Sequence, residues 1–524
     1  MRLLLLFLCA SAIRAAEPFD VCVYAGVPCG VAASIAASRE GAKVLLIEPT
    51  KHVGGLNTSG LNTAETEHML KWTFGGVARE VYERIGRHYA KWEPAYYFES
   101  HIAEKVFKDM LAEAKVEVRF GVRVGKVEKV GARIRSITLS DGSTVEAKVF
   151  VDAGYEGDLM ARAGVGYTWG RESRAEFGEE KAGISFDPPR KAATVDERGG
   201  LLPGISGWVR EFTEGDGDKR VMNYNWRLTF SNDPATRVPF PLPQRYDRAR
   251  FRLLENWLRE NGHAKLTDII DLYAHAPGRK DKREVNNKQA ATISIGHFGG
   301  QFDYPDGDYA TRERIIIDHT DYTLGLLHFL ATDDAVPEKL RAETQQWGLH
   351  KEEFADNANW PYQIYVREAR RMRGAFVVAQ RDVTDDRRKS DSIAMGSHFV
   401  DSHHVQRLAV SPTEFLNEGR IWLEGWAYQI PYRAITPKPE ECVNLLVPGA
   451  ASYTHVAYCT LRLESTWMMV GHAAGVAAAR AALWDKTVQD LIVANLQERL
   501  RAQGQIIDFL PGEPEKFVPP QKKK

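Results

Sequence analysis

Cysteine is scarce in this sequence. The 524 residues include five cysteines, and no two of them form a Cys-x-x-Cys pair. Iron–sulfur clusters and structural zinc sites need a close series of thiolate ligands. The spacing therefore argues against an iron–sulfur cluster, and we predict no metal site. We expect Cys22, Cys29, Cys442 and Cys459 to be buried free thiols.

An excess of charge of one sign is also missing. The chain has 69 Lys and Arg residues against 70 Asp and Glu residues, a formal net charge of -1, and no segment carries a dense basic stripe. Proteins that bind nucleic acids usually present such a basic surface. We therefore expect no nucleic acid partner.

Apolar runs long enough to cross a membrane are missing too. The run Leu3–Ile13 falls short of the ~20 residues that a spanning helix needs, and later runs are too short or too charged. Arg2 precedes this run, and Ala10-Ser11-Ala12 near its end supply a small-x-small cleavage site, which is typical of a signal peptide. We expect residues 1–16 to be a signal peptide, its cleavage point left open, and the mature chain to be exported to the periplasm or secreted.

The length exceeds what one hydrophobic core supports, because single domains stop growing near ~250–300 residues. With 44% hydrophobic and 27% charged residues, the composition is that of a globular chain. We expect at least two domains.

A strand–turn–helix–strand unit follows the apolar run. Residues 20–25 are β-branched and apolar, which predicts a buried strand, and residues 31–39 are small and alanine-rich, which predicts a helix that lies close to a sheet. Residues 43–48 predict a second strand that ends in an acid. In dinucleotide-binding folds, the pyrophosphate lies at the N-terminus of such a helix, and the acid binds a ribose.

The turn of this unit departs from the usual Gly-x-Gly-x-x-Gly pattern. Gly30 matches the third glycine, but Val27 stands where the second is expected. The whole unit still predicts dinucleotide contacts at Gly26, Val27, Gly30 and Glu48.

The segment after the second strand favours FAD over a nicotinamide cofactor. Gly54-Gly55 would let the chain run alongside the ribityl and pyrophosphate groups. A covalent link through His52 is not needed to explain this turn, so we expect non-covalent FAD. The run 116–139 predicts a small antiparallel meander, and 147–154 a buried strand. That strand ends in three further predicted cofactor contacts: Asp152, Ala153 and Gly154.

A distant strand and helix should close the cofactor site. Residues 444–449 predict a strand and turn, and residues 467–482 predict a helix of small residues. We predict cofactor contacts at Gly449, Gly475 and Arg462, whose positive charge near flavin N1 would stabilise the reduced anion. Residues 488–503 predict a further amphipathic helix.

Longer stretches point to one family. They are Asp20–Gly60, Phe98–Leu111, Phe150–Gly178, Tyr304–Arg312, Trp360–Met372, Ser392–Arg407 and Val443–Ala479. On them the chain resembles the FAD-dependent oxidoreductases related to the flavin part of heterodisulfide reductase, some of whose relatives are labelled xanthan lyases. The cysteine series of the relatives that carry iron–sulfur clusters is absent here.

The resemblance implies an α/β fold. An FAD-binding, Rossmann-like, doubly wound domain of the two-dinucleotide-binding-domain flavoprotein type would be interrupted by an inserted α+β substrate domain. The FAD domain would comprise residues 19–166 and 440–484, with the inserted domain at 167–439. Residues 485–524 would form a C-terminal helix and tail.

Histidines are the candidate bases, because their ordinary pKa of ~6.5 lies near working pH. His455 follows the closing turn, and His403 and His404 follow Asp401, whose carboxylate could orient an imidazole. A flavin accepts hydride at N5, and the base would take the hydroxyl proton of an alcohol donor.

Three residues are candidates for substrate binding. Arg367 and Arg371 would share one face of a helix over 365–373 and grip an anion, and Tyr304 is one of several aromatic residues suited to sugar rings.

The leading hypothesis is an exported FAD-dependent oxidoreductase that acts on a small organic molecule, such as a carbohydrate or another alcohol, with an unknown electron acceptor. A polysaccharide lyase and a catalytically silent flavin-binding protein stay open as alternatives.

Overall fold

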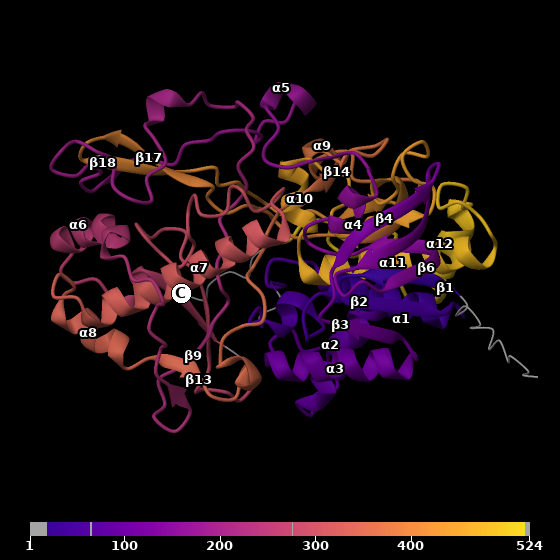
Figure 1. Ribbon diagram of the computed structural model, residues 1–524, viewed down its shortest axis with the longest axis horizontal. Helices are drawn as coiled ribbons and strands as arrows, with labels where there is room; N and C mark the ends of the chain where they lie inside the picture. Colours follow the sequence, from indigo (N-terminus) through magenta and orange to yellow (C-terminus); the bar gives the residue numbers. More distant parts are fainter. Residues whose placement is uncertain (1–17, 63–64, 275, 519–524) are drawn as a thin grey trace, which may run out of the picture.

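The computed structural model describes residues 18–62, 65–274 and 276–518 (Figure 1). The expected signal peptide lies outside the described residues. None of the helices in the described part of the chain is both long and apolar enough to cross a membrane.

A seven-stranded sheet forms the centre of one half of the molecule. Its order is β3-β2-β1-β6-β5-β4, and β21 also pairs with β6. The pairs among β3, β2, β1, β6 and β21 are parallel, whereas β6, β5 and β4 form an antiparallel meander. The strands are β1 (Phe19–Tyr24), β2 (Val44–Glu48), β3 (Glu117–Phe120), β4 (Val124–Val130), β5 (Arg133–Leu139), β6 (Thr144–Asp152) and β21 (Leu445–Leu446).

Two helices rich in small residues pack together beside this sheet. These are α1 (Pro28–Arg39) and α11 (Glu464–Leu483), which lie 425 or more residues apart in sequence. A Cβ atom at Gly471 would lie 2.1 Å from the Cys29 carbonyl oxygen, and one at Gly475 equally close to that of Ala33. Only glycine permits this approach of the two backbones.

Further helices cover the same half of the molecule. They are α2 (Gly76–His88), α3 (Ser100–Glu113), α4 (Asp158–Arg162), α10 (His455–Leu461) and α12 (Val493–Ala502). In Figure 1 the indigo N-terminal elements and the yellow C-terminal elements lie together on the right, so the two ends of the sequence build this half.

Most of the intervening segment forms the other half, on the left of Figure 1. Its main feature is an antiparallel sheet of order β10-β13-β9-β12-β11, with the long helix α7 nearby. The strands are β9 (Thr229–Ser231), β10 (Arg237–Val238), β11 (Ile270–Ala274), β12 (Arg283–Asn287) and β13 (Gly348–His350), and the helices are α6 (Arg252–Glu260), α7 (Tyr309–Thr332) and α8 (Glu338–Gln345).

Small strand pairs and short helices complete this segment. The pairings are β14-β7, β15-β20, β16-β19 and β17-β18-β8. The elements are β7 (Tyr167–Thr168), α5 (Arg174–Phe177), β8 (Arg190–Lys191), β14 (Arg371–Met372), α9 (Gln380–Thr384), β15 (Ser392–Gly396), β16 (Val400–Asp401), β17 (Gln406–Ser411), β18 (Glu414–Glu418), β19 (Trp422–Leu423) and β20 (Tyr428–Pro431).

The structure confirms the α/β fold with its Rossmann-like sheet, and corrects some elements. The predicted helix over 365–373 is wrong, because this segment is irregular apart from the two residues of β14. The extended stretch after Val116 is expected in the meander, but it forms β3 and pairs in parallel with β2. The last helix begins at Val493 rather than at 488, since the Val488 N–H is bonded to the Val443 carbonyl and holds the chain against β21.

Candidate functional site

The turn between β1 and α1 brings a helix N-terminus to the carboxyl edge of the parallel strands. A Cβ at Gly30 would lie 1.9 Å from the Ala25 carbonyl oxygen, so glycine is needed there. Ala25 itself has a φ of 74°, in the left-handed region that favours glycine. The first N–H groups of α1, which have no partners within the helix, can therefore bind a phosphate.

Glu48 stands at the end of β2 beside this turn. Its carboxylate accepts the Gly26 N–H at 2.7 Å and the Thr50 N–H at 2.6 Å. Removal from water raises the pKa of Glu48 to about 7. The carboxyl group borders a cavity of about 300 Å³ that we call the nucleotide cavity. Its lining includes Ala25, Val27, Glu48, Tyr155, Glu156, Trp226, Tyr304, Arg312, Ile364 and Val366.

Gly54 and Gly55 turn the chain after β2, as the sequence suggests. Both have positive φ, 98° and 53°, and a Cβ at Gly55 would lie 2.3 Å from the Tyr155 hydroxyl oxygen. The Tyr155 hydroxyl accepts the Leu56 N–H at 3.1 Å and donates to Glu464 at 2.5 Å. The Gly-Gly turn, the end of β6 and the N-terminus of α11 are thereby joined. Burial raises the pKa of Glu464 to about 8.

Some of the buried polar atoms that have no hydrogen-bond partner among the described residues belong to this junction and its surroundings. They are Asn57 Oδ1, Ser59 Oγ, Trp226 Nε1, Arg227 Nε, Arg367 Nε, Arg462 Nε, Glu464 Oε2 and Thr466 Oγ1. Each such atom costs about 1–3 kcal/mol unless a ligand satisfies it. A mixed set of donors and acceptors fits the edge of a flavin ring, which carries carbonyl oxygens and ring nitrogens. The residues present therefore fit FAD.

Positive charge is concentrated at this point. Arg462 donates to the Tyr365 hydroxyl at 3.0 Å, and Tyr365 in turn donates to Glu65 at 2.7 Å. The Arg367 guanidinium lies over the Tyr365 ring, 4.5 Å from its centre. Burial lowers the pKa of Arg367 to about 9, so it still carries its charge at neutral pH. These cations suit the anion of a reduced flavin.

A second cavity, of about 420 Å³, adjoins these cations, and we call it the polar cavity. Aromatic, acidic and amide side chains share its wall. Its lining includes Glu65, Glu67, His68, Tyr97, Arg227, Asp271, Tyr273, Asn286, Gln289, His398, Asp401, His403, Arg420 and Trp422.

The structure separates the predicted catalytic residues. His403 and Asp401 line the polar cavity, whereas His404 does not. His404 Nε2 instead lies 2.7 Å from Asp187. The idea that Asp401 orients an imidazole is therefore wrong among the described contacts: its carboxylate lies 3.6 Å from Arg462, which also binds its carbonyl oxygen.

His455 lies at the first position of α10 and lines neither cavity. Its Nδ1 is 2.8 Å from the Glu368 carboxylate, and its Nε2 has no partner among the described residues. The N–H of His455 donates to Glu172 at 2.8 Å. The ring is thus held by Glu368 with one nitrogen left open.

The predicted substrate residues are all buried. Arg371 lies between Glu172 and Glu368, so its charge is already neutralised. Arg367 instead binds the Asn223 carbonyl and the Asn225 side chain. Arg367 and Arg371 do not share a helix face, because no helix forms in this segment. Tyr304 borders the nucleotide cavity and donates to Glu156 at 3.0 Å.

Several predicted cofactor residues shape the backbone around the site. Asp152 accepts the Met160 N–H at 2.8 Å and so fixes the turn from β6 into α4. A Cβ at Gly449 would lie 2.4 Å from the Gly154 carbonyl and 2.6 Å from that of Ala153, so these two turns touch through their backbones. Gly475 packs against α1 and lines neither cavity, so the structure gives it a packing role rather than a cofactor contact.

Sequence reasoning missed four residues of the site: Glu65, Tyr155, Tyr365 and Glu464. Tyr155 directly follows the predicted Asp152-Ala153-Gly154 end of a strand, and Glu464 lies just before the predicted closing helix, so their positions gave a usable signal. Glu65 gave none, because an acid in a loop is usually a solvated surface group.

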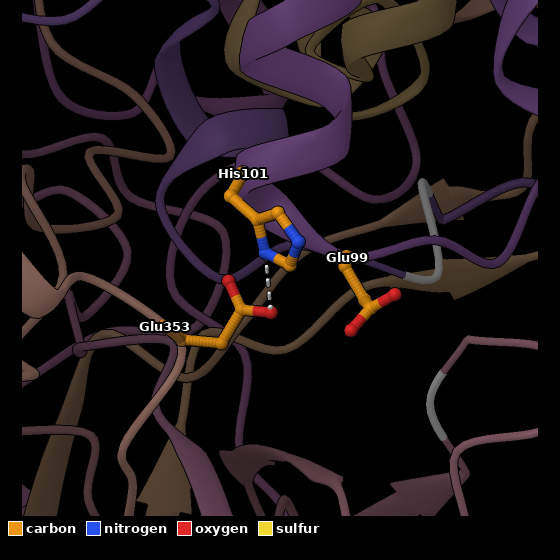
Figure 2. Close-up of side chains that lie close together, drawn as sticks. All are labelled: Glu99, His101 and Glu353. Carbon is orange, nitrogen blue, oxygen red and sulfur yellow. Dashed lines mark hydrogen bonds and ion pairs between the residues drawn. The ribbon is translucent and has the colours of Figure 1, made fainter. Parts of the chain in front are cut away.

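A group of two acids and a histidine, Glu99, His101 and Glu353, places its ligand-type atoms within 4.8 Å of one another (Figure 2). The Lys282 ammonium already lies 2.5 Å from Glu99 and 2.8 Å from Glu353. A cation of the protein therefore balances these carboxylates, and we interpret the group as an ion-pair network.

Comparisons with solved structures return short, distant matches. Thioredoxin reductase from T. acidophilum is 23% identical, covers 26% of this chain and 34% of its own, and has a TM-score of 0.17. THI4 from Thermovibrio ammonificans is 21% identical over 31% of this chain and 70% of its own, with a TM-score of 0.23. L-proline dehydrogenase from P. horikoshii is 12% identical over 35% and 63%, with a TM-score of 0.23. The chain thus spans about a third of the length of the first of these.

A comparison with curated proteins returns no significant match. The sequence does match the family described as FAD dependent oxidoreductase over residues 20–500, which includes both halves of the molecule. This extent supports FAD as the cofactor. The chain belongs to the FAD dependent oxidoreductase family.

Proposed function

We propose that this enzyme oxidises a small polyhydroxylated molecule, such as a carbohydrate or another alcohol, in the polar cavity. The observation that carries this proposal is the position of that cavity. Its wall includes Arg227, Glu65 and Asp401. Glu65 accepts the Tyr365 hydroxyl and lies 3.7 Å from Arg227, and Asp401 lies 3.6 Å from Arg462. A substrate there would lie next to the proposed flavin ring.

The wall of the polar cavity supports a polyhydroxylated substrate. Tyr97, Tyr273 and Trp422 offer apolar ring faces, on which the C–H groups of a sugar ring can pack. Asp271 and Gln289 add hydrogen-bonding groups to the same wall. Ring faces together with hydrogen-bonding side chains suit a molecule with apolar C–H faces and hydroxyl edges.

We propose His403 as the group that accepts the substrate's hydroxyl proton. It lines the polar cavity, is 5% exposed, and its Nδ1 has no hydrogen-bond partner among the described residues. Burial, with Arg367 and Arg462 nearby, holds the pKa of His403 well below its usual range, so the ring is neutral at working pH, and the same surroundings make it a weaker base than a free imidazole. Bound FAD supplies the acceptor for the hydride that leaves the carbinol carbon, and a carbonyl product results. His455, held by Glu368, is the second candidate for the same role.

We also propose how FAD is held and where the enzyme acts. Glu48 would bind the adenosine ribose of FAD, and the N-terminus of α1 would bind its pyrophosphate. Gly54-Gly55 would lie alongside the ribityl chain that leads to the flavin ring. The apolar start of the sequence supports export, and a separate electron acceptor would reoxidise the flavin. We further propose that, within its family, the chain is related to the flavin part of heterodisulfide reductase.

An anaerobic screen tests the proposed function. The purified enzyme is mixed with neutral sugars, sugar acids, simple alcohols and amines, and the loss of the yellow flavin absorbance is followed. We expect a polyol to bleach the flavin, and the same polyol to yield a carbonyl product. Bleaching by amines alone, or breakdown of an acidic polysaccharide without any bleaching, would contradict it; the latter would favour the lyase.

A further inference from the structure

A third cavity, of about 540 Å³, lies in the inserted segment, and we call it the arginine cavity. Arg220, Arg250 and Arg407 all border it, together with the rings of His297, Phe298 and Tyr322. Its lining in the described part of the chain contains no Asp or Glu side chain. The cavity therefore combines three positive charges with apolar ring faces.

Arg407 is the unusual member of this group. It is 3% exposed, and its described hydrogen bond is from Nη1 to the Gly204 carbonyl oxygen, at 3.1 Å. Its Nε has no partner among the described residues, and its guanidinium lies 4.7 Å from the centre of the Phe298 ring. A buried guanidinium is costly unless a negative group balances it.

Most of the other described buried arginines are balanced by an acid. Arg171, Arg227, Arg312, Arg370, Arg371 and Arg462 each form an ion pair with Asp or Glu. Among the described buried arginines, Arg367 and Arg407 have no such pair. Arg367 lies in the proposed flavin site, where a ligand supplies the negative charge. Arg407 lies at the arginine cavity, which predicts a second ligand.

The two other arginines leave the cavity positive. Arg250 is paired with Asp318 at 2.6 Å, and Arg220 lies 3.8 Å from Asp218, but neither acid lines the cavity. Asp318 also binds His297 Nε2 at 2.8 Å, so one carboxylate is shared between two partners. The guanidinium groups can therefore turn their remaining N–H donors toward an anion.

We propose that the arginine cavity binds a small organic anion, with its carboxylate, sulfate or phosphate group on Arg407 and its body against Phe298 and Tyr322. This site is separate from the polar cavity: the two cavities share no lining residue. His403 lines one cavity and Arg407, four residues later, lines the other. The proposal does not depend on the identity of the oxidised substrate.

Binding of defined anions to the FAD-loaded enzyme tests this site. Sodium sulfate, sodium phosphate and sodium glucuronate are each titrated at constant ionic strength, with chloride as the balancing ion, and binding is followed by calorimetry and by the thermal unfolding midpoint. We expect saturable binding of at least one of them. Preference for glucuronate assigns a carboxylate ligand, and preference for sulfate or phosphate assigns the corresponding ester.

Variants locate the bound anion. Arg407→Gln should weaken binding ten- to a hundredfold, as expected for hydrogen bonds to a charged group, whereas Arg407→Lys should keep part of it. Arg220→Gln, at a less buried position, should weaken binding severalfold, and it provides the test if Arg407→Gln does not fold. Arg135→Gln removes an exposed arginine on β5 and should change nothing. Absence of saturable binding of all three anions, or equal binding by the wild type and the folded Arg407 or Arg220 variants, would overturn the proposal.

Discussion

His403 and His455 are both buried histidines, but their surroundings differ. His403 borders a cavity that a substrate can enter, with arginines around it, whereas His455 is bound by Glu368 and lines no described cavity. A general base must lie within hydrogen-bond reach of the proton that it accepts. Access to substrate therefore favours His403 as the general base, whereas the contact with the Glu368 carboxylate, which orients the ring, favours His455 for the same role.

Single replacements separate the two histidines. His403→Asn should keep bound, yellow FAD but reduce the flavin ~10²–10⁴-fold more slowly with the substrate found in the screen, since it removes the proton acceptor. His455→Gln should have a much smaller effect on the same anaerobic stopped-flow rate. The reverse result, a slow His455→Gln and a normal His403→Asn, would move the base to α10.

The pH dependence of flavin reduction follows from the same surroundings. Since the pKa of His403 lies well below its usual range, this ring stays in its proton-accepting form throughout the neutral region. Burial raises the pKa of Asp401 to about 6, so its carboxylate is lost as the pH falls through that value. Without that carboxylate, the charge of Arg462 near His403 is no longer balanced, and proton uptake by His403 becomes less favourable. We therefore expect the rate of flavin reduction to be flat between pH ~6.5 and ~8 and to fall below pH ~6. Asp401→Asn should abolish that fall; a decline centred on pH ~6.5 that persists in Asp401→Asn would indicate an ordinary histidine instead.

At the scale of elements, the sequence predicts the dinucleotide-binding unit well and the inserted segment poorly. The strands and helix of residues 19–48 follow from local pattern, since apolar β-branched runs and small residues decide them within a few positions. The segment 365–373 does not, because its arginines are fixed by partners far away in sequence, such as Glu172 and Asn223. The place of Glu65 in the site is likewise set by residues far away in sequence, Tyr365 and Arg227, so a local sequence pattern does not predict it.

The contact between α1 and α11 should depend on its glycines. Gly475→Ala places a methyl group 2.1 Å from the Ala33 carbonyl oxygen, so the helices must move apart. We expect a loss of about 1–3 kcal/mol in the free energy of unfolding, measured by urea denaturation, because overpacking strains a close contact. Weaker retention of FAD should accompany it, since α1 and α11 both begin at the cofactor site.

Gly262→Ala is the matched control for this contact. No atom lies within 4 Å of the Cβ that it adds, and it should change the stability by a few tenths of a kcal/mol at most. Equal stabilities of Gly475→Ala and the wild type would mean that the helices are less tightly packed than the structure shows.

At the scale of the whole molecule, FAD binding is linked to buried acids. Glu48, Asp152 and Glu464 lie on three elements that meet at the cofactor site, and burial raises the pKa of these groups to about 7, 7 and 8. Each favours its neutral form in the folded protein and its charged form in the unfolded chain near neutral pH. Folding therefore takes up protons there, and the stability that these groups contribute is lost as the pH rises through their folded pKa values.

Histidines make the opposite contribution at lower pH. Burial lowers the pKa of His319 and His398 to about 3 and that of His472 to about 4, so stability rises with pH until the unfolded histidines have lost their protons, near pH ~6.5. At pH ~6.5 the unfolded histidines are still half protonated, so above that pH they continue to offset part of the stability that the three acids lose, and only a comparison between variants isolates one acid.

The change in unfolding free energy of the FAD-free protein between pH ~6.5 and ~8 is measured by urea denaturation at constant ionic strength, in the wild type and in variants. We expect Glu48→Gln, which has no carboxyl group to ionise, to lose about 1 kcal/mol less over this range than the wild type loses. Glu128→Gln, at an exposed position on β4, should show the same change as the wild type. Equal changes in Glu48→Gln and the wild type would show that Glu48 is more hydrated than the structure places it. They would also remove the reason to expect FAD, whose ribose hydroxyls donate to an ionised carboxylate, to bind more weakly as the pH falls below the pKa of Glu48.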